Sequence, residues 1–521
     1  RPLRARPRRI SRKILGIRAA YVFAAPLVIL AMLFGLNVGG MRNRILGNAA
    51  AAPAAIRLAV LPFENLSGDP EQEYFSDGMT QEMIAQLGRL HPETLSVIAR
   101  SSVMRYKKTN TPIDQIGREL DVGYVLEGSA QREGTRVRIQ AELIRVKGQS
   151  QVWADSLERE MSGVLALQNE VSKRIASALA LKLLPAEQAS LAVAPTVNPE
   201  AHEAYLRGSY SLMKVTPGDL DTAEKYFDTA IAKDPTYAPA YAGRSYVWNV
   251  RNQMGFASYQ EAAPKARAAA LKGVELDANS ALTQSALASV RTFIDWDWED
   301  ARGSWRRALE LDPNDAFAQV NYAHYLIIMG SGEEALVHSR RAATLDLFNP
   351  TVLGLHAAVL YFERLYDESI EVYREGLRIQ KDNPLLLNGL WYAYDRKGMT
   401  KEAYETARSS CASLPLPGIE AALDEGYAQG GYTKAMKRAG ESLASHFHET
   451  PCQPSLIATF YALAGENGKA LNWLERGLDM RDSYLPYLGD PVFDAIRSDP
   501  RFRDLCRKVG IPADNVKRQG R

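Results

Sequence analysis

Cysteine is scarce in this sequence, with Cys411, Cys452 and Cys506 the only three in 521 residues. So few thiols in such a length exclude a scaffold built on disulfides, and no two of them form a C-x-x-C pair. If the chain lies outside the cytoplasm, one disulfide with an odd thiol left over is possible. Buried free thiols are the alternative.

The sequence also lacks the common signatures of catalytic and metal sites. It has no G-x-x-x-x-G-K-[ST], H-E-x-x-H or G-x-S-x-G motif. Seven histidines are scattered, and His446 and His448 are spaced so that a helix would point their rings apart. Residues 330–335 match G-x-G-x-x-A, but no strand precedes them, so we interpret them as a turn between helices. We therefore expect no catalytic residue, no cofactor and no metal.

Acidic residues are absent from the first 44 positions, which hold ten basic ones. The other 477 residues carry 53 basic against 61 acidic side chains, a net charge of −8, although the whole chain sums to +2. An acidic body argues against nucleic-acid contact by this chain. A hydrophobic content of 46% excludes a wholly disordered chain, and 24% charged residues exclude a polytopic membrane protein.

Charge is missing altogether from residues 19–41, which are largely apolar. About 20 apolar residues cross a bilayer core, so we predict a transmembrane helix here, after a basic cytoplasmic flank over residues 1–18. The positive-inside rule then places the bulk outside the cytoplasm, which predicts a single-pass membrane protein. A signal peptide that ends in small residues near 48–53 is the alternative. Because the first residue is Arg, we expect a fragment or a processed chain.

After a linker over residues 42–54, residues 55–190 predict a small α+β domain. A first strand begins at residue 56, and residues 137–143 alternate apolar and polar side chains, which is typical of a strand with one buried face. Helical spacing follows the first strand, and Thr111 and Pro112 resemble a helix start. The predicted order is β-α-β-α-β-β-β-α.

Residues 59–78, AVLPFENLSGDPEQEYFSDG, resemble the opening of the TolB-amino-terminal-like domain of bacterial signalling proteins. VLEGS at 125–129, VRI at 137–139 and VWA at 152–154 are similar to its later strands. The resemblance implies a domain between a transmembrane helix and tetratricopeptide repeats. It also implies an upstream cytoplasmic effector, most often a CadC-like winged-helix DNA-binding domain and sometimes a class III cyclase or a Ser/Thr kinase. No such effector is present in this sequence.

A repeat of 34 or 35 residues follows over residues 196–480, marked by Leu276, Leu311, Leu345 and Ile379. This helix–turn–helix period is typical of tetratricopeptide repeats (TPRs), which stack into an all-α solenoid. We predict units near 200–235, 238–277, 281–313, 316–347, 350–381, 384–413, 418–447 and 452–480. Residues 481–521 are predicted to form a C-terminal cap and tail, and DWDWEDA at 295–301 and the motifs of 481–505 extend the family resemblance.

The concave side of the solenoid is the candidate binding surface. Its lining positions in the TPR family fall on aromatic, amide and other side chains suited to peptides. Carrying those positions over gives Tyr246, Asn249, His324, Ile327, Tyr361, Phe362, Asn388, Tyr392 and Arg396. The alternative is that several of them only fill the packing between repeats.

Three functions stay open at this point. The first is the extracytoplasmic sensory and protein-interaction module of a CadC-like membrane regulator, which binds a protein or peptide or associates with itself. The second is the C-terminal regulatory half of a class III adenylate cyclase or a Ser/Thr kinase. The third is a periplasmic TPR scaffold with a cleaved signal peptide.

Overall fold

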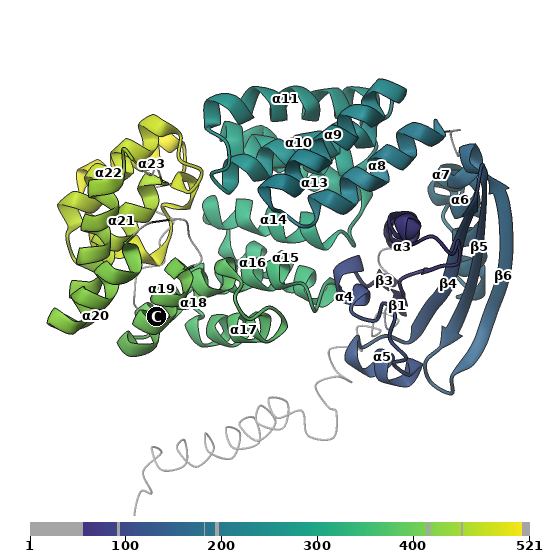
Figure 1. Ribbon diagram of the computed structural model, residues 1–521, viewed down its shortest axis with the longest axis horizontal. Helices are drawn as coiled ribbons and strands as arrows, with labels where there is room; N and C mark the ends of the chain where they lie inside the picture. The colour runs from purple at the N-terminus through teal and green to yellow at the C-terminus, as the bar shows by residue number, and fades with distance from the viewer. Residues whose placement is uncertain are drawn as a thin grey trace, which may run out of the picture. The chain divides into compact units, whose positions relative to one another are not determined.

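The computed structural model describes residues 56–90, 94–181, 183–192, 197–412, 416, 418–449 and 452–512. The basic flank, the predicted transmembrane helix over 19–41 and the linker over 42–54 lie outside these residues. Within the described part of the chain, no helix combines the length and the apolar character needed to span a bilayer. From Ile56 onward the chain forms one compact unit, drawn in colour in Figure 1.

The first part of this unit is a twisted mixed sheet (Figure 1). Its first strands along the chain pair in parallel and its last two pair antiparallel, as expected for strands 124–160 joined by tight turns. The short β2 (Glu64–Asn65) pairs with β4. The strand order is β3 (Leu95–Val97), β1 (Ile56–Val60), β4 (Tyr124–Glu133), β5 (Arg136–Arg145) and β6 (Ser150–Glu160).

One face of this sheet is buried and the other is polar, as the alternation in β5 predicted. Val137 and Ile139 are buried in one cluster with residues of α3 (Glu73–Gly88) and α6 (Val164–Ala178). On the opposite face Arg138 pairs with Glu158 across β5 and β6.

The predicted element order is confirmed, with β2 and the short α4 (Arg100–Met104) in addition. The helix predicted from Thr111 and Pro112 is α5 (Ile113–Glu119), whose N-cap is Pro112 without a side-chain cap bond. A short helix, α7 (Pro185–Ala192), leads toward the repeats.

Eight helix pairs then follow within the described residues, at the predicted units. Small residues lie where paired helices approach closely: Ala301, Ala335 and Ala403 of the second helices are fully buried. The first six pairs are α8 (Pro199–Leu212) and α9 (Pro217–Lys233), α10 (Ala238–Gln253) and α11 (Tyr259–Leu276), α12 (Ala281–Val290) and α13 (Trp298–Leu311), α14 (Ala316–Ile328) and α15 (Gly332–Leu345), α16 (Pro350–Phe362) and α17 (Tyr366–Ile379), and α18 (Pro384–Arg396) and α19 (Thr400–Ala412).

The seventh pair is folded within one element, α20 (Ile419–His446), which breaks at Gly430 and Gly431. Gly431 has a φ of 70°, a left-handed conformation that glycine adopts without strain. The two halves pack so closely that a Cβ on Gly426 would lie 2.6 Å from the Cα of Ala435. The loosely periodic unit at 418–447 is therefore a helix–turn–helix like the others. The eighth pair is α21 (Pro454–Leu463) and α22 (Asn467–Met480).

The last of the described residues, 481–512, are called the closing segment. It contains η5 (Leu485–Tyr487), η6 (Pro491–Ile496) and α23 (Pro500–Val509). The segment was predicted as a cap on the last repeat, but it also reaches back to the third pair. Arg481 donates to the carbonyl of Asp295 at 2.7 Å, and the Trp298 indole donates to the carbonyl of Val509 at 2.9 Å.

Candidate protein-binding groove

The nine predicted partner-binding residues all lie on first helices of the repeats, where the TPR pattern put them. They are Tyr246 and Asn249 on α10, His324 and Ile327 on α14, Tyr361 and Phe362 on α16, and Asn388, Tyr392 and Arg396 on α18. The sequence could not show what covers them.

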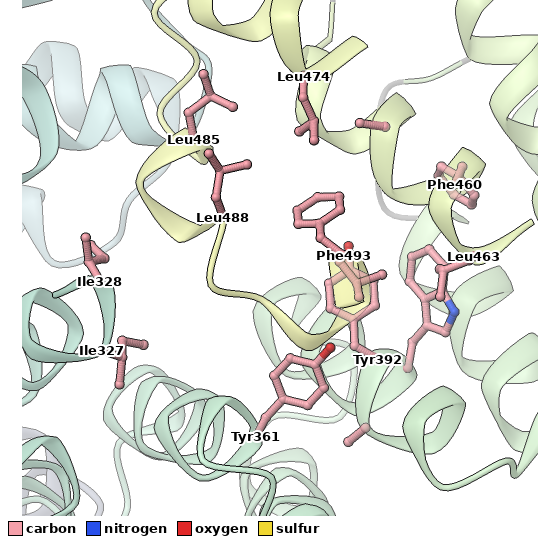
Figure 2. Packing of buried hydrophobic residues seen from close by; sticks show 14 of the residues in the cluster. Ile327, Ile328, Tyr361, Tyr392, Phe460, Leu463, Leu474, Leu485, Leu488 and Phe493 are labelled. Atoms are coloured by element: carbon pink, nitrogen blue, oxygen red, sulfur yellow. The ribbon is translucent and has the colours of Figure 1, made fainter. Parts of the chain in front are cut away.

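The closing segment occupies the inner face of α14, α16 and α18. The Tyr487 hydroxyl lies 3.0 Å from Nδ1 of His324, and the Tyr487 ring contacts those of His324 and Phe362 edge-on, at centroid distances of 5.8 and 5.9 Å. Arg396 donates to the carbonyl of Pro491 at 3.0 Å. Figure 2 shows Tyr361 and Tyr392 beneath Phe493 of this segment. We call this inner face of α14, α16 and α18 the groove. It holds a polypeptide, and that polypeptide belongs to the same chain.

Asp490 is the central polar group of this contact and is fully buried. Its carboxylate accepts hydrogen bonds from the hydroxyls of Tyr361 at 2.8 Å and Tyr484 at 2.6 Å, and from the backbone N–H of Val492 at 2.7 Å. Burial raises the pKa of Asp490, while these hydrogen bonds oppose the shift. Because no guanidinium or ammonium lies within ion-pair distance in the described structure, hydrogen bonds alone satisfy the carboxylate.

An arginine pair fixes the next turn of the segment. Arg364, which follows α16, binds Asp494 through two N–H groups at 2.6 and 3.0 Å. Arg497 donates to the same carboxylate at 2.7 Å and to the carbonyls of Gly489 and Asp490. Burial alone would raise the pKa of Asp494, but the hydrogen bonds from Arg364 and Arg497 make the net shift downward. Such bidentate charge-assisted bonds define one geometry for the segment.

His324 is held neutral in this environment. Burial lowers its pKa to about 4. Its Nε2 lies 3.0 Å from the carbonyl of Leu355, so Nε2 carries the proton and Nδ1 accepts from the Tyr487 hydroxyl. The ring therefore joins α14, α16 and the closing segment without a charge.

Two of the predicted residues lie on α10, and no contact among the described residues joins them to the closing segment. Asn249 is buried and its amide oxygen accepts from Gln253, while its Nδ2 has no hydrogen-bond partner among the described residues. Tyr246 is half-buried, and burial raises its pKa. On α18, Asn388 donates to the Tyr392 hydroxyl at 3.3 Å and so supports that ring.

Apolar burial holds the closing segment more strongly than its polar bonds do. Leu485, Leu488, Val492, Phe493 and Ile496 are all at most 3% exposed. Each large apolar side chain contributes about 1.5–3 kcal/mol when buried, so five contribute about 10 kcal/mol. The closing segment is thus an integral part of the fold.

Sequence reasoning missed the residues of the closing segment that fill the groove: Tyr484, Tyr487, Asp490 and Asp494, together with Arg364 and Arg497. Their signal was present, since apolar residues recur through 485–496 where a solvated tail would be polar. Whether an outside partner uses the nine residues stays a prediction. The structure shows which atoms such a partner would have to replace.

Other candidate sites resolve simply. Residues 330–335 span the end of the turn between α14 and α15 and the first turn of α15, and Gly330 has a φ of 72°. The thiols Cys411, Cys452 and Cys506 are free, and burial raises the pKa of Cys452 and Cys506 to about 11. In the described ranges no three His, Cys, Asp or Glu side chains converge as a metal site.

The α/β part is similar to a domain of known transcriptional regulators. Residues 54–174 match the family described as "HilA/YgeH-like transcriptional regulator, second domain". The transcriptional regulator HilA of Salmonella typhimurium is 26% identical over 345 residues, which cover 65% of this chain and 60% of HilA. A putative adenylate cyclase 3 of Rhizobium meliloti is 36% identical over 195 residues, 37% of this chain and 33% of that protein. The matches thus span less than two thirds of either relative.

Several solved structures are loosely similar to this chain. A tetratricopeptide repeat protein from Parabacteroides merdae aligns with 60% of this chain and 98% of its own, at 14% identity and a TM-score of 0.30. Human IFIT1 aligns with 60% of this chain and 77% of its own, at 14% identity and a TM-score of 0.38.

Proposed function

We propose that the described residues are the regulatory and protein-interacting part of a bacterial transcription regulator. The match of residues 54–174 to the HilA/YgeH-like domain supports the regulatory role. The observation that carries the interaction role is the groove itself, whose Tyr361, Arg364 and Arg396 grip a polypeptide segment through its carboxylates and backbone. This part of the chain has no enzymatic role in the proposal.

The chemistry of the groove defines the partner class. The Tyr361 hydroxyl and the Arg364 guanidinium bind two carboxylates four residues apart, and the Phe362 ring packs against the Tyr487 ring of the closing segment. An outside protein or peptide that uses these groups is therefore acidic and aromatic, and folds into short turns as η5 and η6 do. Self-association through this face would need the closing segment to be exchanged between copies.

We further propose that the protein is a single-pass protein of the bacterial inner membrane, with residues 19–41 in the bilayer, residues 1–18 cytoplasmic and the described unit on the other side. In this proposal a CadC-like winged-helix domain lies upstream, which fits the TolB-like motifs of residues 59–78. The charge separation supports it, because the ten basic residues of the first 44 suit the cytoplasmic membrane surface. Reporter fusions after residue 55 test it: alkaline phosphatase is expected to be active and a cytoplasm-only reporter inactive, and the reverse pattern would refute it.

The regulatory role is tested by expressing the whole gene in the source organism and measuring transcripts and cyclic AMP together. We expect a defined set of transcripts to change while cyclic AMP stays at its basal level. Tyr361→Ala, which removes a groove contact, is expected to lower the transcript response while urea denaturation shows that the variant is still folded. Tyr404→Ala, at a partly buried tyrosine–aspartate pair outside the groove, is expected to leave the response unchanged. An unchanged transcript profile would refute the proposal.

The second candidate is the C-terminal regulatory part of an adenylate cyclase, favoured by the 36% identity to the Rhizobium meliloti protein. It predicts the opposite result in the same experiment. Cyclic AMP would rise on expression, and the purified whole protein would convert ATP to cyclic AMP in vitro.

A further inference from the structure

Aspartates end several of the repeats, and most of them stabilise their own turn. Asp234, Asp277 and Asp312 each accept a hydrogen bond from the backbone N–H two residues later, at 2.9, 3.0 and 3.1 Å. This local bond holds the chain as it leaves one repeat and enters the next.

The turn after α15 is built differently. Its aspartate is Asp346, but the N–H two residues later, that of Phe348, donates to the hydroxyl of Ser102 at 2.9 Å. Ser102 belongs to α4 of the α/β part, and its own hydroxyl donates to Asp346 at 2.7 Å. Ser101 donates to the other carboxylate oxygen, which also accepts from Asn349 at 2.7 Å. Ser102 is thus inserted between the two groups that bond directly in the other three turns.

The surrounding contacts extend this junction on both sides. The N–H of Ala99, the N-cap of α4, donates to the carbonyl of Leu345 at 2.7 Å. The guanidinium of Arg105 lies over the Phe348 ring, 4.1 Å from its centroid. Asp346 is 3% exposed, so water does not replace these partners while α4 is in place.

We propose that α4 and the turn 345–349 form a releasable latch between the α/β part and the repeats. The released state has a ready substitute for the bond that the Phe348 N–H loses, because Asp346 can accept this N–H as its equivalents do in the other turns. Ser101 and Ser102 then bond to water. The closing segment has no such substitute, since its release would expose five buried apolar side chains.

Release at this point is local. Asn314 anchors the preceding turn by donating to the carbonyls of Gly88 and Leu95, at 2.7 and 3.1 Å. Leu206 of α8 packs into the core of the α/β part, against Gly78. These contacts hold while α4 opens, so the two parts stay joined.

The latch is also connected to the start of the described chain. β3, which leads into α4, pairs with β1 along Ile56–Leu58, and the N–H of Ile98 donates to the carbonyl of Leu58 at 2.9 Å. Arg57 in β1 donates to the carbonyl of Thr344, one residue before Leu345, at 3.3 Å. Opening of the latch would therefore change the contacts of β1, the strand to which the upstream part of the protein attaches. This last consequence rests on the proposed function, but the latch itself does not.

Hydrogen–deuterium exchange of the full chain tests the latch. Ser102→Ala is expected to speed exchange at residues 99–104 about tenfold, while the Phe348 amide stays protected by Asp346. Asp346→Ala removes the substitute acceptor and also the carboxylate that positions the Ser102 hydroxyl, so the Phe348 amide is expected to exchange faster as well. Asp277→Ala is the matched control: it removes the same kind of turn bond, at a turn remote from α4, and is expected to leave residues 99–104 unchanged.

Three outcomes overturn the latch: no change at 99–104 in Ser102→Ala, loss of protection at Phe348 in Ser102→Ala, or faster exchange across the whole chain. Ser101→Ala keeps Ser102 in the turn and is expected to have a smaller effect at 99–104, so the test remains decisive if Asp346→Ala does not fold. Transcript levels measured with Ser102→Ala in the whole gene then separate the two claims. Changed exchange with an unchanged transcript response leaves the latch standing and refutes its role in the proposed function.

Discussion

The hydroxyl of Tyr361 on α16 lies 2.8 Å from a carboxylate oxygen of Asp490, 129 residues further along the chain. Both side chains are buried, and neither has solvent as a substitute partner. This bond joins the middle of the solenoid to its end and makes the predicted binding face part of the core.

Removing this hydroxyl should destabilise the protein. Tyr361→Phe leaves Asp490 with one hydrogen-bond donor fewer in a dry site, and we expect a loss of about 1–3 kcal/mol in the free energy of unfolding. Urea denaturation measures it. Tyr404→Phe is the matched control, since Tyr404 bonds Asp424 at 2.7 Å on a more exposed surface, where a loss below about 1 kcal/mol is expected. Equal losses in both variants would contradict a core role for Tyr361.

The closing segment should not exchange with a free copy of itself. A fluorescent peptide of residues 481–499, added to the full chain, is expected to show no change in anisotropy, because the groove is filled and its occupant is held by buried apolar side chains. Phe493→Ala weakens the packing of the closing segment in the groove by about 3–5 kcal/mol, so peptide binding should first appear in this variant. Tight binding of the peptide to the unaltered chain would show that the groove opens readily.

His324 should make stability depend on pH between about 4 and 6.5. Its pKa is lowered to about 4 in the folded chain from an ordinary value of 6.5, so in this window the unfolded chain binds more protons. Stability therefore rises with pH across the window and is lost as pH falls through it. His324→Gln removes this dependence, so its stability difference from the unaltered chain should grow by up to about 3 kcal/mol from pH 4 to pH 6.5.

Denaturation curves at several pH values measure this difference. A flat difference for His324→Gln would mean that the ring is charged or solvated in the folded chain.

The helix–turn–helix inside α20 can be tested at a single glycine. A Cβ on Gly426 would lie 2.6 Å from the Cα of Ala435 and 2.7 Å from the carbonyl oxygen of Lys434, so Gly426→Ala should cost about 1–3 kcal/mol. Gly303 is an exposed glycine of α13 with no heavy atom within 4 Å of its Cβ position. Gly303→Ala should stabilise by about 0.5–1 kcal/mol, because alanine favours helix. A Gly426→Ala protein as stable as Gly303→Ala would rule out the tight pair.

Local patterns predicted most of the fold because they depend on neighbouring residues. The alternation of Val137 and Ile139 with charged residues set the buried face of β5, and the period carried by Leu311 and Leu345 set the repeat boundaries to within a few residues. The predicted start of α5 was one residue too early, because Pro112 is the N-cap and lies outside the helix. Composition does not distinguish the N-cap from the first helical position.

The groove could be predicted only in part, for a physical reason. Helical spacing places Tyr361 and Arg396 on the inner faces of their helices, but it does not say what lies opposite. The occupant comes from a distant part of the sequence, and its polar contacts, such as the bond from Arg396 to the carbonyl of Pro491 95 residues away, leave no periodic trace. The exchange of Ser102 into the turn at Asp346 was unpredictable for the same reason.

The position of the closing segment has a consequence for biosynthesis. A solenoid of nearest-neighbour contacts can acquire structure repeat by repeat as it is translated. Here three hydrogen bonds join the repeats to the closing segment: Trp298 to Val509, Arg481 to Asp295 and Tyr361 to Asp490. They cannot all form until the final turn of α23 has left the ribosome, so the inner face of the solenoid stays incomplete until then. Such late, long-range closure slows folding and leaves apolar surface uncovered in the nascent chain. A stop codon near residue 480 would therefore release a chain with an exposed apolar core, which chaperones would bind and proteases would degrade.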